Sequence, residues 1–249
     1  MLKEERQNYI VQQVNLHNKI MLSSLREVMQ VSDDTLRRDL FELASEGKLV
    51  KVHGGALSNS FGRLNSPKTD VYSLQFKRTI AQKAIKLIRD DMFIMTTGGT
   101  TIVEMARLLP PYLKATLISG SIAAILEYME HPQIDVIVIG DKIAKNSNIT
   151  IGADAIAKVK QIRADICFLG VNAIDLQYGI TDNDWGVVQL KQAMIEASRQ
   201  VVCLSIAEKI NTCQPLKVCD LPDVDLLITE LPPDDPLLEP YAKAGIRIL

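Results

Sequence analysis

The spacing of hydrophobic residues along the chain changes near residue 58. Before that point they recur with the roughly 3.6-residue period of an amphipathic helix. The three groups are Tyr9, Ile10 and Val14, then Leu22, Leu25, Val28 and Met29, then Leu36, Leu40 and Leu43. This pattern predicts a small helical domain at the N-terminus.

From about residue 91 onward, short apolar runs alternate with helical stretches. Most of the runs are uninterrupted, which is typical of strands covered by helices on both faces. The predicted strands are Met92–Met95, Ala115–Ile118, Val136–Ile139, Ile166–Leu169, Val201–Leu204, Leu226–Ile228 and Ile246–Leu249. Repeated alternation of strand and helix predicts an α/β domain with a mainly parallel sheet.

A segment rich in small and polar residues separates the two patterns. Ser58–Asp70 holds three Ser, two Asn, one Gly and one Pro, a composition typical of a linker. We therefore expect an N-terminal domain over 1–57, a linker over 58–75 and a C-terminal domain over 76–249.

The most specific motif lies in the third helical group. Ser32 is a good N-cap, and Asp33 and Asp34 follow in the first turn, where the helix dipole favours negative charge. A short helix over Leu22–Met29, with Ser23 or Ser24 as its expected N-cap, precedes it after a brief turn. Two short helices joined in this way predict a helix-turn-helix.

Cations and hydroxyls are expected on the exposed side of the second of these helices. An Arg in that position can donate two hydrogen bonds to guanine or bind a phosphate. After Gly47, a short strand over Leu49–Val52 and a tight reversal at Gly54-Gly55 predict a wing, which also carries Lys48. The candidate DNA-binding residues are Ser32, Thr35, Arg37, Arg38, Lys51 and His53.

An ordinary helical subdomain is the alternative, with Arg37 and Arg38 paired to Asp33, Asp34 and Glu42. The charge of the domain does not decide between the two, because residues 1–58 contain eight Lys or Arg and eight Asp or Glu.

Taken together, these motifs resemble the winged head of the DeoR family of bacterial transcriptional regulators. The matching residues, in the same order and spacing, are Arg6, Ile10, Ser32, Thr35-Leu36-Arg37-Arg38-Asp39-Leu40, Gly47-Lys48-Leu49 and His53-Gly54-Gly55-Ala56. The resemblance implies a sequence-specific DNA-binding domain, usually that of a repressor. We expect Asp39 to have a structural role rather than to contact a base.

Small polar residues follow several of the predicted strands. Because the carboxyl ends of parallel strands meet at one edge of a sheet, ligands of open α/β folds bind there. Glycines, hydroxyls and helix N-terminal amides at such an edge can hold an anion such as a phosphate, although the same residues can serve for helix capping alone. The candidate effector residues at this edge are Gly98, Gly99, Thr100, Thr101, Ser119, Gly120, Ser121 and Gly140.

The resemblance continues into the C-terminal domain. Gly99-Thr100-Thr101, Ile151-Gly152-Ala153, Lys191-x-Ala193-Met194-Ile195 and Lys209 are similar to the DeoR sensor domain. That domain is similar to the folds of ribose-5-phosphate isomerase, glucosamine-6-phosphate deaminase and CoA-transferase. The resemblance implies a sensor of a sugar phosphate or related metabolite that controls carbohydrate-catabolism genes, and it adds Lys209 to the candidate effector residues.

The chain departs from the family pattern where polar residues are usual, at Thr97, Gly120, Ala144, Val187 and Ile206. These departures predict an effector that is atypical for the family, for example a less charged one, or the loss of effector binding.

Composition alone favours a metabolic enzyme, since the 249 residues are 47% hydrophobic and carry a net charge of −2. An isomerase- or deaminase-type enzyme with an accessory DNA-binding head is therefore the alternative function. Such chemistry needs a carboxylate base, but Asp141, Asp182 and Asp184 have no His or second carboxylate at a suggestive spacing. A pure interaction module would not need the recognition helix, so we predict a regulator and not an enzyme.

Other classes of protein are excluded by simple features. The N-terminus lacks the apolar core of a signal peptide, and the apolar runs are shorter than the roughly 18 residues of a membrane span. Cys167, Cys203, Cys213 and Cys219 form no CxxC pair, so neither a metal site nor a disulfide framework is expected. We expect a cytoplasmic bacterial protein without a cofactor, associated with the nucleoid when bound to DNA. Its expected partners are operator DNA, a small effector and further copies of itself in a homodimer or homotetramer.

Overall fold

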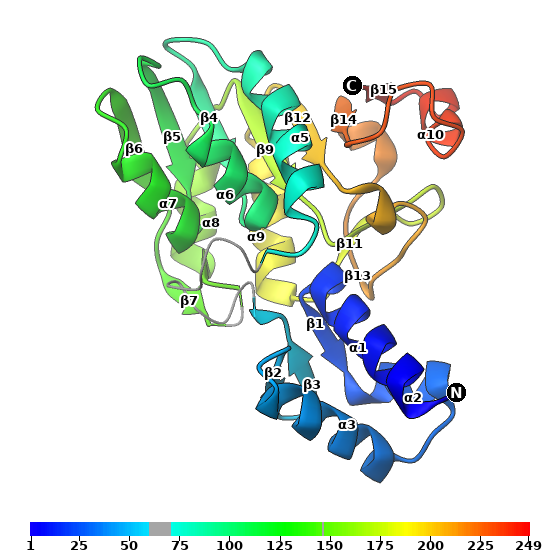
Figure 1. The fold of residues 1–249 in the computed structure, drawn as a ribbon. Helices are drawn as coiled ribbons and strands as arrows, with labels where there is room; N and C mark the ends of the chain where they lie inside the picture. Colours follow the sequence, from blue (N-terminus) through cyan, green and yellow to red (C-terminus); the bar gives the residue numbers. More distant parts are fainter. Residues whose placement is uncertain (60–70, 146) are drawn as a thin grey trace. The chain divides into compact units, whose positions relative to one another are not determined.

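The computed structural model describes residues 1–59, 71–145 and 147–249. The chain forms two compact units, Met1–Tyr72 and Ser73–Leu249, which contain the N-terminal and the C-terminal domain (Figure 1). Most of the predicted linker, residues 60–70, lies outside the described residues.

The N-terminal domain combines helices with a small antiparallel sheet in which β3 lies between β1 and β2. Its elements are α1 (Lys3–His17), β1 (Lys19–Met21), α2 (Leu22–Met29), α3 (Asp33–Ser45), β2 (Val50–Val52) and β3 (Gly55–Leu57). Residues at the predicted helical spacing form its core, among them Ile10, Val14, Leu25, Leu36 and Leu40. The predicted helix-turn-helix and wing are therefore both present.

The predicted N-cap of α2 was wrong. The cap is Met21, so Ser23 and Ser24 lie inside the helix. The reason is strand β1, which ends at Met21 opposite Gly55 and fixes where the helix begins. The amide of Leu22 then donates to the carbonyl oxygen of Gly54 at 2.8 Å.

A seven-stranded parallel sheet in the order β15-β14-β12-β9-β4-β5-β6 forms the centre of the C-terminal domain (Figure 1). Its strands are β4 (Phe93–Thr96), β5 (Ala115–Ser119), β6 (Ile134–Val138), β9 (Ile166–Gly170), β12 (Val201–Leu204), β14 (Leu226–Ile228) and β15 (Arg247–Ile248). Each predicted strand coincides with one of these to within two residues at either end. The predicted fold class, a winged helix-turn-helix followed by a parallel-sheet α/β domain, is confirmed.

Helices cover both faces of this sheet. On one face lie α5 (Leu74–Ala84), α6 (Thr100–Arg107) and α7 (Ile122–Met129), and on the other lie α8 (Ala153–Lys160) and α9 (Trp185–Glu196) (Figure 1). Met95, Ile118 and Cys167 of the sheet pack against Val159 of α8 and Met194 of α9. This double cover explains why the strands are uninterrupted apolar runs.

The remaining elements flank the large sheet. They are a hairpin of β7 (Lys142–Ala144) and β8 (Ile149–Ile151), a sheet of β10 (Ala173–Asp175), β11 (Gly179–Asp182) and β13 (Leu216–Cys219), the short helices η1 (Ile85–Leu87), η2 (Ala207–Lys209) and η3 (Leu221–Asp223), and α10 (Glu239–Lys243).

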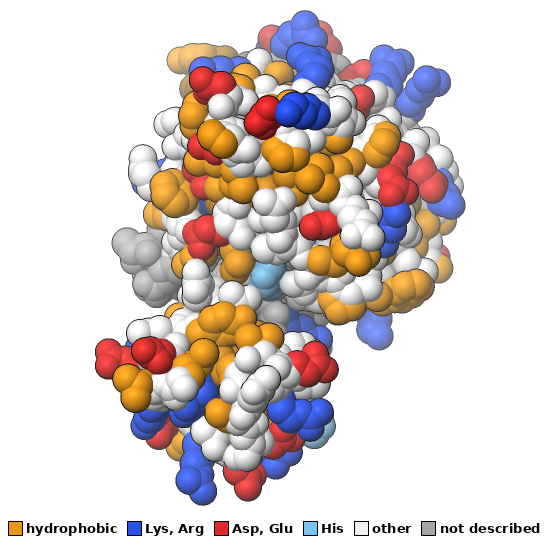
Figure 2. Space-filling view, turned by 90° about the vertical axis from the view of Figure 1, so that its right-hand side faces the viewer, with side chains coloured by type: hydrophobic (Ala, Val, Ile, Leu, Met, Phe, Trp, Pro, Cys, Tyr) orange, Lys and Arg blue, Asp and Glu red, His pale blue; other side chains and the backbone are white. Residues whose placement is uncertain are grey.

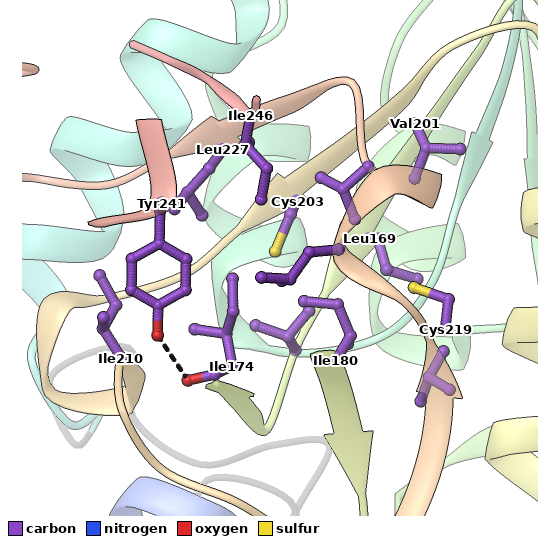
Figure 3. Close-up of a cluster of buried hydrophobic side chains, with 14 of the residues drawn as sticks. Leu169, Ile174, Ile180, Val201, Cys203, Ile210, Cys219, Leu227, Tyr241 and Ile246 are labelled. Atoms are coloured by element: carbon purple, nitrogen blue, oxygen red, sulfur yellow. Dashed lines mark hydrogen bonds between the residues drawn. The ribbon is translucent and has the colours of Figure 1, made fainter. Parts of the chain in front are cut away.

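A second apolar cluster joins the large and the small sheet. Leu169, Cys203 and Leu227 of the large sheet meet Ile174 and Ile180 of the small one (Figure 3). The hydroxyl of Tyr241 in α10 donates to the carbonyl oxygen of Ile174 at 3.3 Å, which satisfies a polar group inside the cluster. This packing fixes the segment after β9 next to the large sheet.

Candidate functional site

The N-terminal end of α3 is organised by its own side chains. Ser32 is the N-cap, and its hydroxyl oxygen accepts a hydrogen bond from the amide of Thr35 at 3.3 Å. The hydroxyl groups of Ser32 and Thr35 are also hydrogen-bonded at 2.9 Å. The structure thus gives Ser32 a capping role, and it orients the hydroxyl of Thr35 at the end of the helix.

The exposed side of α3 carries the two predicted arginines. Asp34, Arg37, Arg38, Phe41 and Glu42 line one shallow open groove, as expected for positions three, four and seven apart. Arg37 lies 3.8 Å from Asp34, and both side chains are mostly exposed, so the pair contributes little to stability. Within residues 1–59, 71–145 and 147–249, no carboxylate lies at ion-pair distance from Arg38.

The other acidic residues of α3 are paired elsewhere. Asp39 is 2% exposed and pairs with Arg6 of α1, whose Nε lies 2.5 Å from its Oδ2. Glu42 pairs with Lys3 of α1 at 2.6 Å and accepts a hydrogen bond from Gln7 at 2.8 Å. The expected structural role of Asp39 is confirmed.

The pairing of Asp39 and Glu42 with α1 affects which cations of the N-terminal domain are free of a carboxylate partner. Lys, Arg, Asp and Glu side chains are mixed on the visible face of the N-terminal domain, in the lower part of Figure 2, in keeping with its zero net charge. Because the buried Asp39 and the partly exposed Glu42 are both paired with cations of α1, neither carboxylate neutralises Arg37 or Arg38.

The wing places further cations beside the recognition helix. Lys51 of β2 is exposed, and its Nζ lies 5.5 Å from the centre of the Phe41 ring. His53 is exposed in the turn between β2 and β3, whereas Lys48 pairs with Glu46 at 2.8 Å. Phe41 was not among the predicted DNA contacts, although its spacing of three and four residues from Arg38 and Arg37 indicated the same face.

In the C-terminal domain, the predicted effector loops do lie at the carboxyl ends of neighbouring strands. Gly98-Gly99 joins β4 to α6, and Gly99 has a φ of +117°, a value that favours glycine. Ser119-Gly120-Ser121 joins β5 to α7, and the hydroxyl oxygen of Ser121 accepts from the amide of Ala124 at 3.4 Å. The capping alternative therefore applies to Ser121.

The β7–β8 hairpin covers these loops. A Cβ atom on Gly98 would lie 2.4 Å from Cδ1 of Ile149, and the amide of Thr150 donates to the carbonyl oxygen of Gly120 at 2.9 Å. The space that remains is about 10 Å³, enough for one water molecule. It is lined by Thr96, Thr97, Gly98, Gly120, Ile149, Val187, Leu190, Lys191 and Met194. A space of this size is too small for a sugar-sized metabolite, and the sequence pattern did not predict that Ile149 covers these loops.

Two lysine amino groups bind successive carbonyl groups at the end of β9. Nζ of Lys191 donates to Gly170 at 2.8 Å, and Nζ of Lys209 donates to Val171 at 2.7 Å. Burial, together with the charges of Lys77 and Lys191, lowers the pKa of Lys209 to about 7. Burial likewise lowers the pKa of Lys77 to about 8, against the opposing effect of nearby carboxylates.

We call Lys77, Lys191 and Lys209 the lysine cluster. Only Lys209 was among the predicted effector residues. Lys77 and Lys191 come from α5 and α9, helices far apart in the sequence, so only the folded structure identifies them as neighbours of Lys209.

The carboxylates considered as catalytic bases all have structural partners. Asp182 is 2% exposed, and its Oδ2 lies 2.7 Å from Nζ of Lys191. Burial opposes its ionisation, but the charge of Lys191 holds the pKa of Asp182 below its usual range. Asp184 caps α9, and Asp141 accepts from the amide of Asp154 at 3.3 Å.

No group of three or more potential metal-ligating side chains occurs in the part of the chain that the structure describes. All four cysteines are free. None of the helices in that part is long and apolar enough to cross a membrane.

Comparison with protein families decides what the two domains are. Residues 6–61 match the model of the DeoR-like helix-turn-helix domain, and residues 73–231 match that of the DeoR C-terminal sensor domain. The chain belongs to the DeoR family. It is therefore a DNA-binding transcriptional regulator with a sensor domain, as the sequence motifs predicted.

Individual relatives agree with this DeoR assignment. The HTH-type transcriptional regulator GolR of Listeria innocua is 27% identical over 100% of this chain and 98% of its own length. The glycerol-3-phosphate regulon repressor of Haemophilus influenzae is 30% identical over 92% of this chain and 90% of its own.

Ribose 5-phosphate isomerase A from Methanocaldococcus jannaschii aligns with a TM-score of 0.42 and 18% identity, over 56% of this chain and 55% of that one. The chain thus spans about half the length of that solved structure.

Proposed function

We propose that this DeoR-family regulator represses genes for the use of a carbohydrate or related metabolite, and that an anionic effector at the lysine cluster releases it from DNA. The proposed DNA binding is supported mainly by the exposed position of Arg37 and Arg38. The acids Asp39 and Glu42 of the same helix are paired with residues of α1. The glycerol-3-phosphate regulon repressor of H. influenzae, at 30% identity, supports the metabolic role.

In this proposal α3 enters the major groove of operator DNA. Thr35, Arg37 and Arg38 contact base edges or phosphates near the N-terminal half of the helix, and Lys51 and His53 of the wing contact the backbone. Two N-terminal domains bind two half-sites, so the working form is a homodimer or homotetramer assembled through the C-terminal domain.

The effector site combines the lysine cluster with the loops at Gly98-Gly99-Thr100-Thr101, Ser119-Gly120-Ser121 and Gly140. An anion beside the buried amino groups of Lys77 and Lys209 favours their charged forms, which offsets part of the cost of their burial. The N-terminus of α6 adds backbone amides for the same anion.

The departures from the family pattern support an atypical effector. Thr97 is buried, and its hydroxyl oxygen accepts from the amide of Gly170 at 2.8 Å, so the group is already used. Val187 and Ile149 make the cavity wall apolar. We infer that the effector pairs a single anionic group with a compact, less polar body.

The same geometry favours regulation over catalysis. Each carboxylate weighed as a base is held by a lysine or by backbone amides, so none is free to remove a proton from a substrate. We therefore propose that the chain has no enzymatic activity, and that it acts in the bacterial cytoplasm on nucleoid DNA.

The DNA half is tested with binding sites selected from random DNA by the purified protein. Arg37→Ala or Arg38→Ala is expected to weaken binding by about 1–3 kcal/mol if the side chain contacts a base. Arg163→Ala, which removes an exposed cation from the C-terminal domain, is the matched control and leaves affinity unchanged. Affinity is also expected to fall steeply with salt. Unchanged affinity in both recognition-helix variants would show that α3 does not contact DNA.

The effector half is tested by calorimetry against a panel of phosphorylated sugars and smaller anionic metabolites. A ligand of the proposed class binds the wild type, weakens DNA binding, and loses affinity in Lys209→Met. Tight binding of a common phosphosugar would contradict the atypical effector.

A further inference from the structure

One apolar side chain stands among the charged residues on the recognition face of α3. Phe41 is 64% exposed, and it lines the same groove as Asp34, Arg37 and Arg38. Scattered surface hydrophobics are common, so exposure alone indicates nothing. What distinguishes Phe41 is its place one turn beyond the arginines expected to contact DNA.

The spacing along the helix fits neighbouring base pairs. At about 1.5 Å per residue, Phe41 lies about 4.5 Å beyond Arg38 along the axis of α3. Successive base pairs are about 3.4 Å apart. A helix lying in the major groove therefore brings Phe41 to the base pair next to the one that Arg38 reaches.

Lys51 of the wing lies beside the phenyl ring. Nζ of Lys51 lies 5.5 Å from the ring centre, within range of a cation–π interaction. The ammonium group is thus held next to the recognition helix, where a DNA phosphate can pair with it. In the proposed complex, docking of α3 in the groove reduces the exposure of the phenyl ring to water.

The chemistry of the groove restricts what Phe41 can contact. A phenyl ring neither donates nor accepts an ordinary hydrogen bond, so placing it over the polar edge of guanine or cytosine leaves those groups without partners. Thymine presents an apolar C5-methyl group in the major groove, and Phe is among the side chains that pack on it.

We propose that Phe41 packs on the C5-methyl group of a thymine next to the base pair contacted by Arg38, and that it thereby determines part of the operator sequence. This inference rests on the proposed binding of α3 in the major groove, and it adds a specificity-determining residue that the charged side chains do not supply.

The experiment uses the full chain and DNA selected from a random pool. Wild type, Phe41→Ala and Phe76→Ala are each used for selection and then for affinity measurements. Phe76 is also an exposed helical phenylalanine, 46% exposed, but it lies on α5 of the C-terminal domain and serves as the matched control. Wild type and Phe76→Ala are expected to select a site with one fixed thymine in each half-site. Phe41→Ala is expected to select the same site without that preference.

The methyl group is then removed by replacing that thymine with deoxyuridine. Burial of one methyl group corresponds to a loss of about fourfold in wild-type affinity for each contact. Phe41→Ala is expected to bind the thymine and deoxyuridine sites equally. Circular dichroism of each variant confirms that the fold is kept, as expected for an exposed side chain.

The possible failures differ in what they overturn. If the wild type selects no sequence at all, the proposed DNA function is wrong. In a second outcome, the wild type selects a site whose affinity falls by the same factor in wild type and Phe41→Ala when deoxyuridine replaces thymine. In that case the proposed role of Phe41 is wrong, but the proposed DNA binding is not contradicted. If Phe41→Ala and Lys51→Ala weaken all sequences equally and keep the thymine preference, Phe41 only positions Lys51, and the inference is again overturned.

Discussion

The guanidinium group of Arg6 and the carboxylate of Asp39 form a two-point pair inside the N-terminal domain. Nε of Arg6 lies 2.5 Å from Oδ2 of Asp39, and Nη2 lies 3.1 Å from Oδ1. The side chains are only 10% and 3% exposed. The pair ties α1 to the buried side of the recognition helix, so it sets the orientation in which Arg37 and Arg38 are presented.

Breaking this pair is expected to destabilise the N-terminal domain. Asp39→Ala leaves the Arg6 guanidinium buried without its partner, which costs on the order of 3 kcal/mol. Hydrogen exchange of the α1 and α3 amides measures the loss. Glu42→Gln is the control, because its partner Lys3 is largely exposed, and only a small change is expected. Equal protection in the two variants would mean that the buried pair contributes no more than a surface pair.

The sequence predicted the architecture better than it predicted the site. Uninterrupted apolar runs predicted the strands of the large sheet, because burial on both faces selects an apolar residue at every position of a strand such as Val201–Leu204. This criterion missed β1, since Lys19–Met21 is too short to show a period and forms only by pairing with β3.

The site depended on contacts between distant segments. The spacing identified Arg37 and Arg38 on α3, where one helix suffices to define a face. It gave no sign that Ile149 covers Gly98, or that Lys77 and Lys191 lie near Lys209, because these residues come from different elements and meet only in the folded domain.

The buried pair of Lys191 and Asp182 gives a prediction for the C-terminal domain. Lys191→Met leaves the Asp182 carboxylate buried without its cation, and we expect the free energy of unfolding to fall by about 3–5 kcal/mol. Denaturant unfolding measures this change. The double variant Lys191→Met with Asp182→Leu removes both charges and is expected to regain much of the loss. If the double variant is less stable than Lys191→Met, the unpaired carboxylate of Asp182 is not the cause of the lost stability.

The lysine cluster predicts how stability changes with pH. The pKa of Lys209 is lowered from 10.5 to about 7 by burial, so between these values the unfolded chain binds more protons than the folded one. Stability of the C-terminal domain therefore rises with pH across this window, and Lys77, with a pKa of about 8, adds to the slope from 8 upward. Melting temperatures measured between these two pH values test whether stability rises in this way. Lys209→Met is expected to flatten the slope, and an unchanged slope would contradict the assignment.

Anion binding at the same lysines is expected to weaken as pH rises through 7. An anion beside Lys209 favours the protonated amine, so its binding takes up a proton when that amine is neutral. Sulfate is a suitable probe, because its own charge is constant over this range. Isothermal titration calorimetry at a series of pH values measures the sulfate affinity. Sulfate affinity that is independent of pH, or unaffected by Lys209→Met, would place the anion elsewhere.

Gly55 is the position where one added methyl group is expected to disturb the wing. A Cβ atom there would lie 2.0 Å from the carbonyl oxygen of Ile20 and 3.1 Å from Cα of Met21, both in the backbone of β1. Because backbone atoms cannot rotate away as a side chain can, Gly55→Ala is expected to separate β1 from β3 and to lower the free energy of unfolding by about 1–3 kcal/mol.

Gly140→Ala, where nothing lies within 4 Å of the added atom, is the control. Thermal unfolding and DNA affinity are both expected to fall in Gly55→Ala alone, since β1 leads into α2 and β3 pairs with β2, which carries Lys51. A variant as stable as the control would show that the two strands accommodate the methyl group.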